Sequence, residues 1–145
     1  MRDLQKGYEM RHRPLTDKNK YYIPKEDYLT AIHYSLRYPT WVALLETSAD
    51  TRGAIRYDKD RVQTSNLYDS TSETAIKMEE YAKRKQIIDD VVQRITEKNN
   101  MSKWLILGVC YGLTYPQLQQ QGIPCGPDMY YDMRRKYYYE LIQVI

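Results

Sequence analysis

The sequence predicts an all-α protein, a helical domain with a long central helix and a C-terminal helix-turn-helix. Apolar residues recur at helical spacing in each of the longer segments, which is the main sequence signal for amphipathic helices. Residues that commonly start and end helices border these segments. Strand-like alternation is weak and confined to residues 54–64, where a short hairpin is the alternative to an irregular loop.

Composition places the chain among globular proteins. Its 145 residues suffice for one domain with its own core, and 42% of them are apolar against 28% charged. The chain has 16 tyrosines and no phenylalanine, so tyrosine rings must supply aromatic core area while their hydroxyls need partners. No apolar run reaches membrane-span length and no signal-peptide pattern is present, and the two cysteines suggest free thiols. We therefore expect a cytoplasmic protein without membrane contact.

Charge is unevenly distributed along the chain. Residues 1–20 carry six lysines and arginines against three acidic residues, whereas residues 101–145 carry four against three. We interpret residues 1–20 as a flexible basic arm, which is either a solvated terminus or an arm that contacts phosphate groups. The net charge of +3 is small for a nucleic-acid-binding protein, so binding to DNA would call for a homodimer or a larger partner. The remaining expected units are residues 21–69 and residues 70–145.

The unit after the arm is predicted to be a helical hairpin followed by a loop. Pro24 suits a first helical turn and opens a helix over residues 24–37, in which apolar side chains follow helical spacing. Pro39 is expected to end this helix, and Thr40 is expected to cap a second one. Turn-forming residues are frequent over residues 48–69, which predicts the loop.

The longest helix is predicted over residues 71–98. Ser70 has Glu73 three residues later, a capping-box pattern that marks a helix N-terminus. Charged residues dilute the middle of its apolar stripe, so this helix either packs within the chain or pairs with a second copy as a coiled coil. Ser102 is expected to cap the next helix, which is apolar on nearly all sides and ends at Gly112.

The last third of the chain predicts a helix-turn-helix. Thr114 is expected to cap a short helix over residues 115–121. The residues that shape the motif are the inward-facing Leu118, the left-handed Gly122, the plug residue Ile123 and Pro127 at the start of the last helix. The turn is longer than the three or four residues usual for such a motif.

The last helix has an apolar face and a polar face when residues are placed at helical spacing. We predict that the polar face and its flanks contact DNA in the major groove through Asp128, Tyr131, Asp132, Arg134, Arg135, Lys136 and Tyr139. In this interpretation Arg135 pairs with guanine, whereas Arg134 and Lys136 hold phosphates. The alternative is a plain helical hairpin with a solvated basic face. Tyr138 and Ile142 lie off the apolar stripe, so they are expected to contact the N-terminal helices or another subunit.

Three stretches carry a resemblance to a known family: YIPKEDYLTAIHYSLRYPTW, DSTSETAIKMEEYAKRKQIIDDVV and GLTYPQLQQQGIPCGPDMYYDMRRKYYYEL. They resemble small phage and prophage proteins of Firmicutes related to the RinA and ArpU late transcriptional regulators, which share a C-terminal helix-turn-helix of the sigma-factor region-four type. The similarity covers most of residues 21–145. It implies binding to double-stranded DNA, control of late or packaging genes and contact with RNA polymerase, and it assigns the groove-facing role to residues 128–139.

No enzymatic activity, cofactor or metal site is expected. The two histidines and two cysteines lack zinc-ligand spacing, and no phosphate-binding loop, nucleophile elbow or dinucleotide fingerprint occurs. The main alternative to DNA binding is a phage-encoded helical module that grips a host protein, such as RNA polymerase or, in the manner of anti-CRISPR proteins, a defence nuclease. Tyrosine and arginine are enriched at protein interfaces, so the same residues serve either function.

Overall fold

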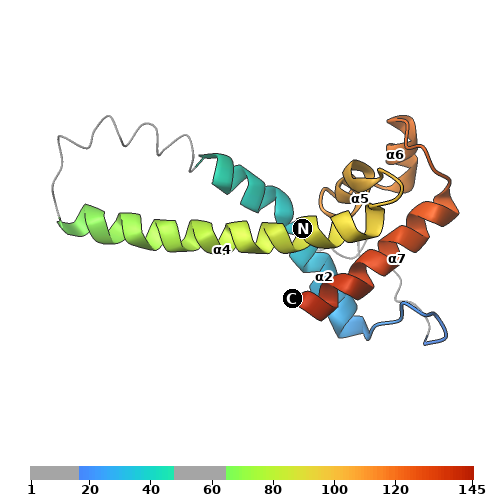
Figure 1. Cartoon of the computed structure of the whole chain (residues 1–145), viewed down its shortest axis with the longest axis horizontal. Coiled ribbons are helices and arrows are strands. Elements are labelled where there is room, and N and C mark those ends of the chain that lie inside the picture. Colours follow the sequence, from blue (N-terminus) through green and yellow to red (C-terminus); the bar gives the residue numbers. More distant parts are fainter. Residues whose placement is uncertain (1–16, 48–64) are drawn as a thin grey trace, which may run out of the picture.

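The computed structural model describes residues 17–47 and 65–145, and within these ranges the secondary structure is helical (Figure 1). The helices are α2 (Lys25–Leu36), α4 (Ser65–Thr96), α5 (Ser102–Val109), α6 (Tyr115–Gln120) and α7 (Pro127–Val144), together with a helical segment over residues 38–47. The predicted all-α class is therefore confirmed, including the long central helix and the final helix. Within the described ranges, no helix combines the length and apolar character needed to cross a membrane.

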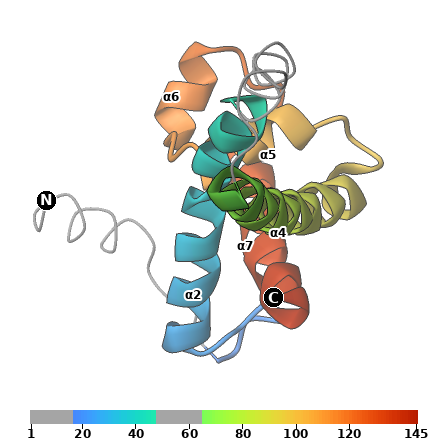
Figure 2. The same ribbon diagram turned by 90° about the vertical axis from the view of Figure 1, so that its left-hand side faces the viewer.

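The two halves of α4, which has 32 residues, have different surroundings. Its second half packs on α7 and α5, and α2 and α7 contact each other where they cross, whereas the first half of α4 projects away from α5, α6 and α7 (Figures 1 and 2). On the projecting half Ile76 remains 59% exposed. Ion pairs four residues apart, such as Glu79 with Lys83 at 3.5 Å, run along this helix. Such exposed pairs add little stability, so α4 is held mainly by the packing of its second half.

The main core joins residues that lie far apart in the sequence. Ile32 of α2, Val92 of α4 and Tyr137 of α7 are all buried in one cluster. The hydroxyls of Ser35 and Tyr137 share a buried hydrogen bond of 2.8 Å, so this polar pair costs little to bury. The core therefore includes both the first described helix and the last one.

Tyr138 packs on the N-terminal part of the chain. Its ring meets the ring of Tyr28 in α2 edge-on, with ring centroids 5.4 Å apart. Tyr138 is buried, and Ile142 is partly buried against the same core. Of the two expected partners, the N-terminal helices or another subunit, Tyr138 contacts the N-terminal helix α2, whereas Ile142 packs at the edge of the main core.

The first helix is found close to its predicted position, but the hairpin after it is not. Arg37, the residue that follows α2, keeps right-handed helical dihedral angles. The chain therefore does not fold back, and residues 38–47 continue onward from α2 with a bend (Figures 1 and 2). Pro39 lies in the first turn of this segment, where a missing backbone N–H is tolerated, so Thr40 is inside the helix rather than its cap.

The predicted start of α4 is wrong. The helix begins at Ser65, so Ser70 lies inside it rather than at its cap, and residues 65–69 of the expected loop are helical. A polar, solvated stretch can be helical without an apolar stripe of its own when it continues a packed helix. The remainder of that loop, including the expected hairpin over residues 54–64, lies outside the described residues.

Ser102 also has a different role from the predicted one. It is the first helical residue of α5, and Met101 occupies the capping position. The hydroxyl of Ser102 instead shares a hydrogen bond of 2.6 Å with the hydroxyl of Thr96, the last residue of α4. This contact links the two helices across their connecting turn, which local sequence cannot show.

Candidate nucleic-acid interface

The short helix α6 begins as the sequence predicts. Thr114 is its N-cap and has extended dihedral angles, and Pro116 follows in the first turn. The backbone N–H of Thr114 donates to the side-chain oxygen Oε1 of Gln117 at 2.9 Å, as in a capping box. This local network defines where α6 starts relative to the end of α5.

The turn between α6 and α7 depends on a glycine and a buried isoleucine. Gly122 has a positive φ of 95°, which a side chain would strain. This conformation lets the N–H of Ile123 donate back to the carbonyl of Leu118 at 3.1 Å, and the Ile123 side chain is buried. The hydroxyl of Tyr115 also donates to the carbonyl of Cys125 at 2.7 Å. The turn is therefore a defined structure although it is long.

A second core cluster holds the two helices together. Its buried members come from the start of α5, from α6, from the turn and from α7: Met101, Leu118, Ile123, Tyr130 and Met133. The predicted inward role of Leu118 and the predicted plug role of Ile123 are confirmed. Because one core spans both helices and the turn, α6 and α7 form a single packed helix-turn-helix arrangement rather than two independent helices.

Close packing between α5 and α7 centres on Gly108. A Cβ atom at this position would overlap the hydroxyl of Tyr130 and would lie 2.9 Å from its ring carbon Cζ. Tyr130 is fully buried, and its hydroxyl has no hydrogen-bond partner in the structure. Burial raises the pKa of Tyr130 to about 12, although the nearby charge of Arg134 acts in the opposite direction. The absence of a side chain at Gly108 therefore sets the position of α7.

The first turns of α7 present the predicted polar face. Asp128 and Asp132 are exposed, and Arg135 and Lys136 are half-buried. Met129, which the sequence reasoning did not assign to this face, is 45% exposed. The accessible surface therefore combines two carboxylates, two cations and one apolar side chain. Such a surface can both donate and accept hydrogen bonds, and its charges nearly cancel.

Arg134 and Tyr131 are held in an aromatic group beside that face. The guanidinium carbon of Arg134 lies 4.8 Å from the centroid of the Tyr131 ring. Tyr131 in turn contacts the rings of Tyr115 and Tyr130, at centroid distances of 6.1 Å and 5.4 Å. Burial raises the pKa of Tyr28, and the charges of Arg134 and Arg135 act in the opposite direction.

Tyr139 is the predicted contact whose surroundings differ most from the expectation. Its ring lies 5.8 Å, between centroids, from the ring of Tyr21 in the segment that precedes α2. The ammonium group of Lys20 lies over the ring of Tyr21, 4.9 Å from its centroid. The sequence reasoning missed Tyr21 and Lys20, because a contact between residues more than a hundred positions apart leaves no periodic signal.

The described residues contain no group of three or more histidine, cysteine or acidic side chains arranged to hold a metal ion. Burial raises the pKa of the Cys125 thiol, which keeps it protonated. No protein-family model, curated protein or solved structure matches this chain.

Proposed function

We propose that this protein binds double-stranded DNA through α6, the turn and α7, with the first turns of α7 in the major groove. The role proposed for it is that of a phage or prophage transcriptional regulator that acts on late or packaging genes, with RNA polymerase as a further partner. The observation that carries the DNA-binding part is the second core cluster. Leu118 of α6 and Tyr130 of α7 are both buried in this cluster, while Asp128 and Asp132 are exposed and Arg135 is half-buried.

Arg135 is the central base-reading residue of this proposal. It follows the accessible first turns of α7, and its planar guanidinium can pair with two acceptors of guanine. Asp128 and Asp132 repel phosphate, but their carboxylates can accept a hydrogen bond from the amino group of cytosine. They therefore favour sites that contain G·C pairs over sites that lack them. Arg134 and Lys136 flank this face and supply phosphate contacts.

Selection from a pool of random duplexes with the purified protein tests the proposal. A discrete sequence should be enriched, and Arg135→Ala should then weaken binding to it by roughly 1–3 kcal/mol and relax preference at one base pair. Lys77→Ala is a matched control, because Lys77 is an exposed cation on the projecting half of α4 and lies outside the proposed DNA contact. Enrichment of no sequence, together with equal affinities of both variants, would refute the proposed groove contact.

A second copy of the chain is the partner proposed to add affinity. At the end of the projecting half of α4 and just beyond it, Glu79 and Glu80 precede Lys83 and Arg84, so an antiparallel pair of these helices would place opposite charges together. Ile76 is exposed on the same half and would be covered. Sedimentation should show a dimer that Ile76→Asp weakens. A wild-type monomer at micromolar concentration, with and without DNA, would exclude this arrangement.

Binding to a host protein is the second candidate function. It is favoured by large apolar side chains that remain 45–59% exposed on different parts of the described surface, Met129 on α7, Tyr111 after α5 and Ile76 on α4. Purified RNA polymerase is the first probe. Polymerase capture that Met129→Ser abolishes, without enrichment of any DNA sequence, would favour this function over DNA binding.

A further inference from the structure

We propose that residues 17–22 form a strap that adds phosphate contacts to the DNA interface of α7, chiefly through Lys18 and Lys20. This inference rests on the proposed DNA binding and names the part of the chain that grips the backbone beside the groove. It starts from the observation that α7 alone is nearly neutral on its accessible face, where Asp128 and Asp132 offset Arg135 and Lys136.

The strap is anchored to α7 by an aromatic contact. The ring of Tyr21 lies against the ring of Tyr139, and the backbone N–H of Tyr21 donates to the side-chain oxygen of Asn19 at 2.9 Å. Ile23, which follows, is buried in the main core. These contacts hold a short segment without regular helix beside α7, on the same face from which Arg135 projects one turn before Tyr139.

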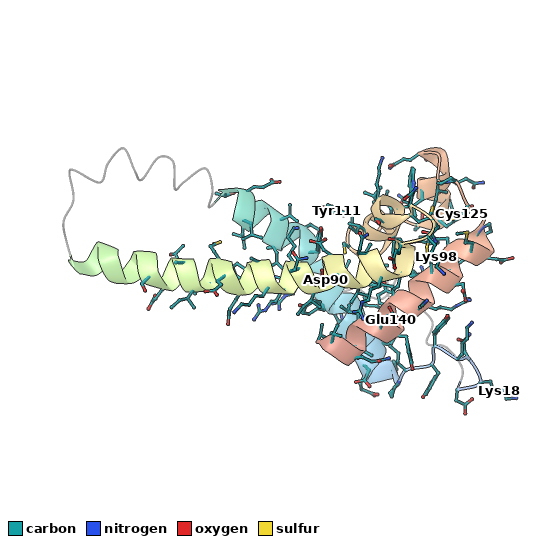
Figure 3. All side chains as sticks on the ribbon, in the orientation of Figure 1. Lys18, Asp90, Lys98, Tyr111, Cys125 and Glu140 are labelled. Atoms are coloured by element: carbon teal, nitrogen blue, oxygen red, sulfur yellow. The ribbon has the colours of Figure 1, made fainter. Side chains whose placement is uncertain are left out.

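The anchored segment carries its positive charge outward. The ammonium group of Lys20 lies over the Tyr21 ring, and Lys18 is exposed at the outer end of the segment, clear of the helices (Figure 3). Asp17 is the acidic residue of this strap, so its net charge is +1. The exposed Lys25 at the start of α2 adds nothing to this charge, because the exposed Glu26 and Asp27 follow it. A helix in the major groove has a row of phosphates on either side of it, so cations held beside α7 face one of these rows.

The salt dependence of binding measures this contribution directly. Each neutralised phosphate of a duplex contributes roughly −0.9 to the slope of log affinity against log salt concentration. Replacing both lysines, Lys18→Ala with Lys20→Ala, should therefore reduce the steepness of that slope by about 1.8. Between 50 and 200 mM salt, the wild type should lose about 12-fold more affinity for a labelled duplex than this variant loses.

Two further variants separate the strap from a general loss of charge. The matched control, Lys77→Ala with Arg94→Ala, removes the same charge from exposed positions of α4 outside the charge pairs of the proposed dimer and should keep the wild-type slope. Tyr21→Ala should flatten the slope as the double lysine variant does, because the anchor is lost, whereas Tyr21→Phe keeps the ring and should behave like the wild type.

The outcomes distinguish this inference from the proposed function. Duplex binding with a wild-type slope in the variant that lacks Lys18 and Lys20 would overturn the strap while leaving the groove contact of α7 in place. Equal flattening by the α4 control would also overturn it, because charge alone would then explain the effect. Absence of duplex binding by the wild-type chain, with capture of RNA polymerase instead, would overturn both.

Discussion

Replacing Gly108 by alanine tests the packing that positions α7. Helix propensity alone favours alanine in a helix by roughly 0.5–1 kcal/mol. The added carbon, however, would overlap the Tyr130 hydroxyl and lie 2.9 Å from its Cζ atom. Because Tyr130 is fully buried, its ring has little room to retreat, and overpacking of this kind costs roughly 1–3 kcal/mol. We expect Gly108→Ala to reduce the free energy of unfolding by about 1–2 kcal/mol.

Urea unfolding followed by circular dichroism provides the assay, with the midpoint as the readout at unchanged slope. Gly126→Ala is the control, because a Cβ atom there would meet nothing within 4 Å. Tyr130→Phe removes the hydroxyl that the added Cβ atom would overlap, so it should recover part of the loss caused by Gly108→Ala. A Gly108→Ala protein as stable as the wild type, or more so, would show that α5 and α7 do not approach this closely.

Three further variants or conditions follow from the cores. Leu118→Ala should lower stability by roughly 2–5 kcal/mol in urea unfolding, because the fully buried side chain belongs to the second core cluster; a smaller loss would mean that α6 packs loosely. Tyr38→Phe removes a 2.7 Å hydrogen bond to Asp89 and should cost about 1–2 kcal/mol near neutral pH; an unchanged midpoint would argue against that bond. Burial raises the pKa values of Tyr137 and Cys110 in the folded chain. As the pH rises, the unfolded chain therefore releases these protons at a lower pH than the folded chain does. The free energy of unfolding should therefore be constant from pH 7 to 8 and fall above pH 9–10, by up to about 1.4 kcal/mol per pH unit for each group. Tyr137→Phe should reduce that fall. A free energy of unfolding that does not change with pH would contradict the burial of the two groups.

The candidate site was only partly predictable. The sequence located Arg135 and the two exposed carboxylates, because helical spacing separates them from Tyr130 and Met133 on the same helix. It did not place Tyr139 against Tyr21 or Arg134 over Tyr131. Aromatic contacts of this kind depend on which helices meet and on rotamers, and neither is encoded in the periodicity of one segment.

Local signals determined the positions of α2, α6 and α7. Pro24 and Pro127 immediately precede or begin helices in the structure, and Gly122 has the left-handed conformation that its place in the turn requires. These features depend on the dihedral preferences of single residues, which are the same in any fold. The sequence alone therefore sufficed for the all-α class and for the order of parts in the helix-turn-helix.

Only the tertiary structure decided three features. They are the length of α4, the continuation of the helical segment past Pro39 and the need for a residue without a side chain at Gly108. Each outcome is set by long-range packing. The second half of α4 is stabilised by α7 and α5, and Gly108 faces a ring from a helix that starts almost twenty residues later. The first half of α4 cannot be predicted from an apolar stripe, because its stability comes from the packed second half that it continues.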